Sequence, residues 1–326
     1  MVVGPPSELT TSVRRVRVVV TGGAGFIGGN LCRRLLVTDG IDDVVVVDDL
    51  STGNLDNLAG LPVRVVHGSV ENAAVLDDAC AGAQAVVHLA ALGSVPRSVN
   101  DPVASHAANT TGTLMVLEAA RRHGGLHTVV ASSSSVYGAN PSLPKHEGLA
   151  TRPMSPYAAT KLATEAYALA WRHSYGLPVL AFRFFNVFGP LQPAGHAYAA
   201  VIPSFIDAAL RGQPLTVHGD GTQSRDFTYV DTVTSVIADA VQRGVSDPEP
   251  VNLAYGSRVT LLEVIAQLEA MLGRPLERVH TPTRAGDVPH SQADSTRVNE
   301  LFGHIAPTPF AVGLRATVDW MSDVAD

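Results

Sequence analysis

The stretch Val16-Arg17-Val18-Val19-Val20-Thr21-Gly22-Gly23-Ala24-Gly25-Phe26-Ile27-Gly28 decides the fold class. Its valine-rich first half predicts a buried strand, and glycines spaced three apart follow where the strand turns into a helix. Small residues let a backbone approach a pyrophosphate, and the free N–H groups at a helix N-terminus bind its charge. Because glycine-rich turns are common, this stretch alone is weak evidence for a dinucleotide site, and other motifs of the chain must agree with it.

Strand and helix patterns alternate after this stretch. The predicted strands are 44–47, 85–89, 127–131 and 179–182, and the predicted helices are about 26–37, 72–80, 102–122 and 156–175. Strands made almost entirely of valine suit a parallel sheet with helices on both faces. The sequence therefore predicts an α/β, doubly wound parallel sheet of the Rossmann type.

The predicted helices and strands become shorter after Asn186. Glycine and proline separate shorter elements there, with helices expected near 201–211, 233–243 and 261–272. We expect a loose leader at 1–13, a dinucleotide-binding Rossmann domain over 14–186, and a smaller α/β domain over 187–326. The last segment is expected mainly to bind substrate, with chain crossings back to the first domain.

Composition narrows the possible partners. The 326 residues hold 23 Lys and Arg against 30 Asp and Glu, a net charge of -7, which offers no general attraction for nucleic acid. No apolar run approaches the roughly 18 residues of a membrane span, and Glu8 lies where a secretion signal would be apolar. We expect a cytoplasmic protein without a nucleic-acid or membrane partner.

Cysteine and histidine spacing predicts no metal site. Cys32 and Cys80 each lie in a helix-like segment without metal-ligand spacing, which indicates reduced core thiols. His123 and His127 are separated by a Gly-Gly pair that breaks any helix, so they are expected in a turn.

A carboxylate ends the second predicted strand. Asp48 follows the run 44–47 and lies twenty residues after Gly28, where it can bind the ribose hydroxyls of NAD and repel a 2′-phosphate. Its alternative role is to cap the loop 49–53. With the glycine turn, Asp48 favours NAD over NADP.

A tyrosine and a lysine lie one turn apart on the helix that Ser155 and Pro156 begin. Tyr157 and Lys161 share a helix face, and a nearby ammonium lowers the pKa of a phenol from its usual value of about 10. The pair therefore predicts a general base. Coincidence is the alternative, but the chain has only two lysines and seven tyrosines.

Four serines follow the strand at 127–131. Ser132-Ser133-Ser134-Ser135 brings hydroxyls to the carboxyl edge of the sheet, where such folds bind ligands. One of them could pass a proton to the tyrosine. A polar strand end without chemistry is the alternative.

These motifs resemble the extended short-chain dehydrogenase/reductase family from about Arg14 to the end of the chain. They occur in the family's order together with His88-Leu89-Ala90-Ala91 and Arg183-Phe184-Phe185-Asn186-Val187-Phe188-Gly189-Pro190. Within that family the chain looks most like nucleotide-sugar 4-epimerases, particularly those acting on UDP-N-acetylglucosamine. The segments 91–98, 197–203, 224–227 and 286–294 carry this likeness. The resemblance also implies a homodimer formed through the helices at 102–122 and 156–175.

The resemblance implies a set of site residues. The catalytic residues would be Ser133, Tyr157 and Lys161. The NAD site would comprise Gly22, Gly25, Phe26, Ile27, Gly28, Asp48, Asp49, Ser51, Thr52, Gly53, Ser69, Val70, Leu89, Ala90, Ala91, Tyr157 and Lys161. The substrate site would comprise Gly93, Ser94, Ser133, Ser134, Tyr157, Asn186, Gln192, Ala200, Val201, Ile202, Arg225, Arg284, Asp287 and Ser291.

Within the substrate set, the resemblance gives individual roles. Arg225 and Arg284 would bind the diphosphate, Asn186 a phosphate or sugar oxygen, and the segment 201–203 would pack against uracil. A surface ion pair with a neighbouring aspartate is the alternative for each arginine.

Four serines depart from patterns in this family. Ser134 and Ser135 follow the catalytic hydroxyl where dehydratases and decarboxylases carry acidic residues, so the usual group for elimination is missing. Ser69 replaces an aspartate that binds adenine, which bears on NAD affinity. Ser291 lies where glucose-restricted epimerases have a bulky tyrosine, which would leave room for an N-acetyl group.

We therefore expect reversible C4 epimerisation of a UDP-hexose, UDP-GlcNAc to UDP-GalNAc, through a 4-keto sugar with recycled NAD. A UDP-glucose 4-epimerase or a UDP-glucuronate-acting relative is the alternative among enzymes. A non-catalytic NAD-binding sensor is the alternative from another class.

Overall fold

The computed structural model describes residues 16–194, 199–283 and 289–325, so the leader predicted at 1–13 lies outside the described residues. Its largest element is a seven-stranded sheet in which every neighbouring pair is parallel. The strands, in spatial order, are β3 (Arg64–His67), β2 (Ile41–Asp48), β1 (Val16–Thr21), β4 (Ala85–His88), β5 (His127–Ser133), β6 (Val179–Phe184) and β11 (Val251–Leu253).

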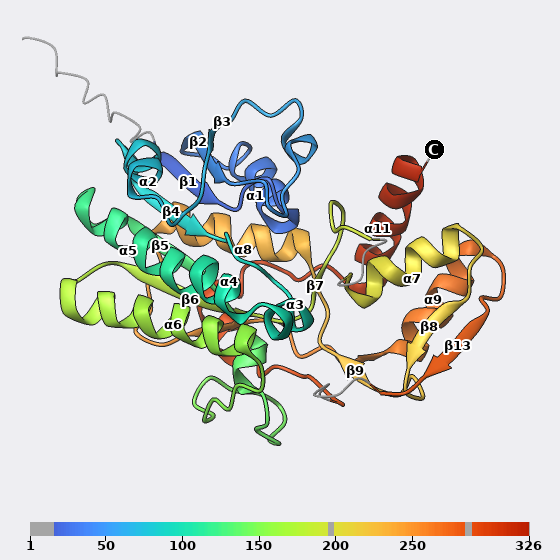
Figure 1. Ribbon diagram of the computed structural model, residues 1–326. Coiled ribbons are helices and arrows are strands. Elements are labelled where there is room, and N and C mark those ends of the chain that lie inside the picture. The colour runs from blue at the N-terminus through green and yellow to red at the C-terminus, as the bar shows by residue number, and fades with distance from the viewer. Residues whose placement is uncertain (1–15, 195–198, 284–288, 326) are drawn as a thin grey trace, which may run out of the picture.

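Helices cover both faces of this sheet (Figure 1). One face carries α1 (Phe26–Leu35), α8 (Val230–Arg243) and α10 (Thr296–Phe302), and the other carries α2 (Ala73–Cys80), α5 (Gly112–Arg122) and α6 (Pro156–Tyr175). Alternate valines of one strand serve the two layers: Val18 and Val20 pack toward α1, whereas Val19 packs toward α2 and α5. The predicted doubly wound fold is confirmed.

The strand order reverses between β1 and β4. Chain connections lead from β1 outward through β2 to β3 and then return to β4 on the other side of β1. Ligands of such sheets bind outside the carboxyl ends of the strands at this reversal. The glycine turn after β1 and the Leu89–Ala91 segment after β4 both lie there.

The long helix predicted at 102–122 is interrupted. It divides into α4 (Pro102–His106), a widened π-helical turn at Ala107–Thr111, and α5. Within that turn the Asn109 amide accepts from the Leu92 N–H at 2.7 Å and donates to Thr160 Oγ1 at 3.0 Å. These contacts join residues far apart in the chain, which helical periodicity cannot reveal. The short helix α3 (Val95–Asn100) before it was not predicted.

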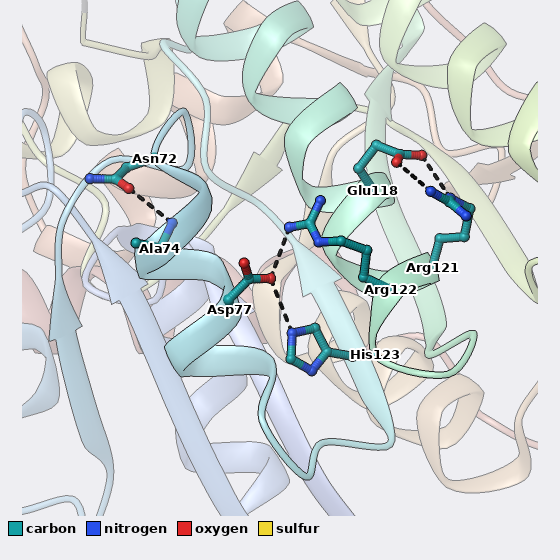
Figure 2. Close-up of polar contacts among 7 residues, drawn as sticks. All are labelled: Asn72, Ala74, Asp77, Glu118, Arg121, Arg122 and His123. Carbon is teal, nitrogen blue, oxygen red and sulfur yellow. Dashed lines mark hydrogen bonds and ion pairs between the residues drawn. The ribbon is translucent and has the colours of Figure 1, made fainter.

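Surface polar contacts hold α2 and α5 together, as Figure 2 shows. Asp77 of α2 accepts from Arg122 at 2.8 Å and lies 3.1 Å from the ring of His123. Glu118 of α5 pairs with Arg121 at 2.9 Å. Its other oxygen accepts from the Trp171 indole of α6 at 2.9 Å, so α6 is braced against α5 far from the carboxyl edge of the sheet.

A second, smaller lobe follows residue 186. Its core lies between α7 (Val201–Leu210), α9 (Leu261–Leu272), α11 (Phe310–Ala325) and a parallel pair of strands, β8 (Leu215–His218) and β13 (Arg278–Thr281). Two more short pairs are β7 (Val187–Phe188) with β10 (Thr228–Tyr229), and β9 (Ser224–Arg225) with β12 (Val259–Thr260). Both α8 and β11 come after residue 186 yet belong to the main sheet and its helices. The domain boundary at residue 186 stays a prediction.

In the part of the chain that the structure describes, no helix combines the length and the apolar character that crossing a membrane would require.

Candidate active site

A cavity of about 1090 Å³ opens at the carboxyl ends of β1, β4 and β5 and extends to the second lobe. Of the residues predicted to hold the cofactor, all except Gly53 line it: Gly22, Gly25, Phe26, Ile27, Gly28, Asp48, Asp49, Ser51, Thr52, Ser69, Val70, Leu89, Ala90, Ala91, Tyr157 and Lys161. Of the predicted substrate residues, those that line it are Gly93, Ser94, Ser133, Tyr157, Asn186, Gln192 and Ala200.

Close backbone packing explains the glycine turn. Gly22 has φ +71°, and a Cβ there would lie 2.7 Å from the Ala90 nitrogen. A Cβ on Gly28 would lie 2.1 Å from the Gly22 carbonyl oxygen, so α1 can approach β1 this closely only with glycine. Among the described residues no side chain caps the start of α1 at Gly25, which leaves its N–H groups for a ligand. This arrangement fits the diphosphate of a dinucleotide.

Asp48 is buried at the end of β2 and performs the capping role that was its alternative interpretation. Its Oδ2 accepts from the Ala24 N–H and its Oδ1 from the Leu50 N–H, each at 2.9 Å. Burial raises the pKa of Asp48, and these two backbone bonds act against the rise. A Cβ on Gly53 would lie 2.8 Å from Asp48 Oδ1, so Gly53 packs behind the carboxylate instead of facing the cavity. Ribose binding by Asp48 stays a prediction that its position in the cavity wall allows.

Ser69 lines the cavity between Gly68 and Val70. Its hydroxyl oxygen accepts from the Glu71 N–H at 3.1 Å, which leaves the hydroxyl proton available to a ligand. A serine here can therefore still offer one hydrogen bond to a base.

His88 holds the β1 and β4 ends in register beneath the cavity. Its ring nitrogens lie 2.8 Å from Thr21 Oγ1 and 3.0 Å from Thr113 Oγ1. Burial lowers the pKa of His88 to about 3, so the ring is neutral at neutral pH. Sequence analysis used His88 only as part of a motif, because its threonine partners come from other elements.

Tyr157 lies in the first turn of α6, as predicted. Ser155 Oγ accepts from the Ala158 N–H at 3.1 Å, Pro156 occupies the first turn, and the Tyr157 N–H donates to Ser98 Oγ at 3.0 Å. Burial raises the pKa of Tyr157, while a hydrogen bond with Ser133 lowers it. The tyrosine and the serine that sequence analysis paired are thus in contact.

The predicted effect of Lys161 on Tyr157 is not found. Lys161 Nζ is directed at β5, where it donates to the carbonyl oxygen of Ala131 at 2.9 Å, and burial lowers its own pKa to about 8. The pKa of Tyr157 is raised by burial, because desolvation outweighs the other influences on the phenol.

The Ser133 hydroxyl is oriented by its neighbours. Its oxygen accepts from the Ser135 hydroxyl at 2.9 Å and from the Ser135 N–H at 3.1 Å. With both lone pairs used, the Ser133 proton is free to point at the phenol. Ser134 does not line the cavity, and neither Ser134 nor Ser135 supplies an acid.

At the substrate end, two amide side chains face the cavity. Asn186 donates to the Asp226 carbonyl oxygen at 3.1 Å, which fixes its amide and leaves its Oδ1 as an acceptor for a sugar hydroxyl. Gln192 donates to the Val187 carbonyl oxygen at 3.3 Å. Its Oε1 is buried and has no hydrogen-bond partner within the described part of the chain. This oxygen can therefore accept a hydrogen bond from a hydroxyl or N–H group of a ligand.

The chain matches the model of the NAD dependent epimerase/dehydratase family over residues 18–254. It belongs to this family. NAD is accordingly its cofactor, and the glycine turn, the uncapped start of α1 and the carboxylate at the end of β2 suit that group.

Relatives in the NAD dependent epimerase/dehydratase family differ in the sugar that they are named for. A UDP-glucose 4-epimerase of Mycolicibacterium smegmatis is 36% identical over 94% of this chain and 98% of its own. The structure of the UDP-N-acetylglucosamine 4-epimerase from Methanobrevibacter ruminantium M1, in complex with UDP-N-acetylmuramic acid, is similar with TM-score 0.89 and 34% identity, covering 95% of this chain and 99% of that one. A UDP-glucuronic acid 4-epimerase from Bacillus cereus, in complex with UDP-glucuronic acid and NAD, has TM-score 0.87 and 28% identity, covering 95% and 100%.

Several predicted substrate residues of this family member do not line the cavity. Ile202 lies in the core of the second lobe, and Val201 packs against that core. Arg225 donates to the carbonyl oxygens of Ser224 and Pro289 at 3.0 and 3.2 Å, and the Ser291 N–H donates to the Ser224 carbonyl oxygen at 3.1 Å. Their roles stay predictions. Arg284 and Asp287 lie outside the described residues.

The cavity wall also contains residues that no sequence pattern indicates. Trp320 and Val324 of α11 line it, as do Asn54, Asn57 and Leu191. Asn57 donates to the Ala24 carbonyl oxygen at 2.8 Å and so supports the glycine turn from outside. No pattern in the sequence indicates Trp320, because the last helix reaches the cavity only through the packing of the second lobe.

Proposed function

We propose that the chain interconverts the C4 epimers of a UDP-hexose, with UDP-N-acetylglucosamine and UDP-N-acetylgalactosamine as the pair. The observation that carries the proposal is the position of Tyr157 and Ser133 together in the wall of the cavity that the glycine turn also lines. A base and its hydroxyl partner therefore lie where a substrate would meet the cofactor.

Three residues of the chain have separate roles in the proposed reaction. NAD, when bound, supplies the reversible acceptor of the C4 hydride. Tyr157 takes the proton of the C4 hydroxyl, and Ser133 holds that hydroxyl against the phenol. Lys161 is largely cationic at pH 7, because its pKa is about 8. Its ammonium would hold the nicotinamide ribose.

The neighbours of Ser133 favour epimerisation over elimination. Dehydration needs an acid beside the sugar, and the two residues after Ser133 are serines. The 4-keto sugar must instead present its other face before the hydride returns. Gly93, Ser94 and Ala200 are small residues of the cavity wall and would leave room for that rotation.

The N-acetyl preference is the finer part of the proposal. Ser291 is small where glucose-restricted relatives are expected to carry a tyrosine, and the solved UDP-N-acetylglucosamine 4-epimerase is among the similar structures. The relatives named for glucose and glucuronate keep those two substrates as alternatives. The sensor alternative is disfavoured because Ser133, Tyr157 and Lys161 are all present.

We also propose that the protein is a cytoplasmic homodimer. Apolar side chains are exposed on the helices that the family resemblance assigns to the interface: Val103 of α4 is 76% exposed and Tyr175 of α6 is 55% exposed. A second copy of the chain would cover them. Sedimentation at several protein concentrations tests this, and a monomer at all of them would contradict it.

The function is tested by incubating purified protein with UDP-GlcNAc, UDP-glucose and UDP-glucuronate in parallel and following the products by NMR. We expect UDP-GalNAc to form fastest, with little need for added NAD. Faster conversion of either other sugar would replace the N-acetyl assignment by that alternative. Accumulation of reduced cofactor in step with product would indicate a simple dehydrogenase, and no conversion at all would favour the sensor.

A further inference from the structure

Glu165 extends a series that begins with the two catalytic residues of α6. Tyr157, Lys161 and Glu165 follow one another at intervals of four, so they lie along one face of the helix. Each lies beside one of three consecutive residues of β5. Lys161 donates to the Ala131 carbonyl oxygen at 2.9 Å, and Glu165 accepts from Ser132 Oγ at 3.0 Å. Tyr157 lies near enough to Ser133 for the hydroxyl to lower the pKa of the phenol, and both line the cavity.

Glu165 is itself held by a buried cation. Arg183 of β6 donates to both carboxylate oxygens, through Nη2 to Oε1 at 2.6 Å and through Nε to Oε2 at 2.9 Å. The Arg183 side chain is 4% exposed and that of Glu165 is 6% exposed. The carboxylate thus accepts three hydrogen bonds from two strands of the sheet, and its position relative to both is defined.

Arg183 is fixed from its other side. Its guanidinium lies 4.8 Å from the centre of the Tyr137 ring and donates to the Glu147 carbonyl oxygen at 3.2 Å. Tyr137 in turn donates to Asn252 Oδ1 at 2.7 Å, which ties this group to β11. Arg183 therefore has no freedom to follow a shift of the helix.

A buried ion pair of this kind is poorly explained by stability alone. Removing two charges from water costs about as much as their attraction returns, and apolar residues of similar size often serve a core as well or better. Its hydrogen bonds are directional, so they fix the position of α6 along and around its axis, which apolar packing does not. A slip of α6 by one residue would move Tyr157 by about 1.5 Å and turn it by about 100°, and the bonds to Ser132 and Arg183 forbid that slip.

We propose that Glu165 is a positioning residue that sets the rotation and axial position of α6 on β5, so that the Tyr157 phenol meets the Ser133 hydroxyl. Ser132, which Glu165 binds, is the residue directly before Ser133 in the chain. The inference rests on the proposed function, since it assumes that Tyr157 and Ser133 act on the substrate.

The test compares Glu165→Gln with Glu118→Gln. The first substitution keeps the size of the side chain but turns one accepting oxygen into a donor that faces other donors. Glu118 also braces α6, through Trp171, at the opposite end of the helix from Tyr157. We expect kcat of Glu165→Gln to fall about 10-fold to 100-fold, the scale of a misplacement near 1 Å, with KM changed less than about twofold. The Glu118 control should keep both constants.

A second comparison separates positioning from general support of the fold. In a Tyr157→Phe background, Glu165→Gln should cause no further loss of kcat, because the group that it positions is already gone. An equal fractional loss in both backgrounds would overturn the proposal, as would unchanged kcat in the single variant. The substrate is whichever UDP-sugar the wild type converts fastest, so a wrong N-acetyl assignment changes the assay but not these outcomes.

The double variant Glu165→Met with Arg183→Met covers the case in which the single variant fails to fold. Replacing both charges by apolar side chains of similar size should preserve folding, with Tm close to that of the wild type. We expect kcat to fall as in Glu165→Gln. A stably folded double variant with wild-type kcat would show that α6 needs no polar contact at this point, and would overturn the proposal.

Discussion

Tyr157 and Ser133 line the same cavity, although one lies in the first turn of α6 and the other ends β5 24 residues earlier. Ser135 donates twice to the Ser133 hydroxyl oxygen, which leaves the Ser133 proton for the phenol. Burial makes the phenolate of Tyr157 costly, and the Ser133 bond lowers that cost.

Loss of the phenol hydroxyl should abolish most of the turnover. Tyr157→Phe keeps the ring and its packing, so we expect kcat to fall by about two orders of magnitude or more without a change in Tm. Tyr175→Phe on the same helix is the matched control, because Tyr175 is exposed and far from the cavity. Near wild-type turnover in Tyr157→Phe would remove the tyrosine from the mechanism.

Lys161 should make stability depend on pH. Burial lowers its folded-state pKa to about 8 from an ordinary value of 10.5, so between these values the unfolded chain binds a proton that the folded chain lacks. The contribution of Lys161 to the free energy of unfolding therefore rises with pH across that window. Lys161→Met removes this contribution.

Relative to wild type, Lys161→Met should be most stabilised at pH 7, and its advantage should shrink between about pH 8 and pH 10. The measurement is the difference in the free energy of unfolding between the two proteins, from urea titrations at each pH. Other titrating groups cancel in this difference. A difference that stays constant with pH would mean that Lys161 has an ordinary pKa.

Crowding in the glycine turn should make Gly28 intolerant of any side chain. A Cβ at Gly28 would lie 2.1 Å from a backbone oxygen, so Gly28→Ala must displace α1 from β1. We expect a loss of about 1–3 kcal/mol in stability together with weaker NAD binding. Gly148→Ala is the control, because its Cβ would meet only His146 ring atoms, the nearest at 3.4 Å. Calorimetric NAD binding and urea unfolding measure both effects, and wild-type behaviour of Gly28→Ala would contradict the close approach.

The room for an N-acetyl group is tested at Ser291. If this residue controls access to the C2 substituent, Ser291→Tyr should lower kcat/KM for UDP-GlcNAc about 10-fold to 100-fold and spare UDP-glucose. Ser291→Ala should leave both values unchanged. An unchanged ratio in the tyrosine variant would exclude the gatekeeper role, which is a strict test because Ser291 does not line the cavity.

Local signals were sufficient where structure depends on near neighbours in the chain. The helix predicted at 156–175 has those bounds, because Ser155 caps it, Pro156 suits its first turn and Gly176 ends it in a left-handed conformation. The valine strands and the glycine turn were predicted for the same reason. The run of valines in the strands indicates that they are buried. The small size of the glycines indicates that two backbone segments approach each other closely.

Directions of side chains across elements were decided only by the tertiary structure. The spacing of Tyr157 and Lys161 was read correctly as one helix face, yet it could not show that the ammonium turns to Ala131 of β5. The partners of Glu165 and the π-helical turn at Asn109 likewise depend on strands and loops that become neighbours after folding.

The sequence by itself therefore determined the doubly wound sheet, the dinucleotide turn and the helix that carries Tyr157 and Lys161 on one face. Only the tertiary structure decided which predicted substrate residues reach the cavity, since Ile202 turns into the core of the second lobe while Trp320 of the last helix lines the cavity wall. The reason is physical. Backbone periodicity is a property of consecutive residues, whereas the direction of a side chain into a cavity depends on how whole elements pack against one another.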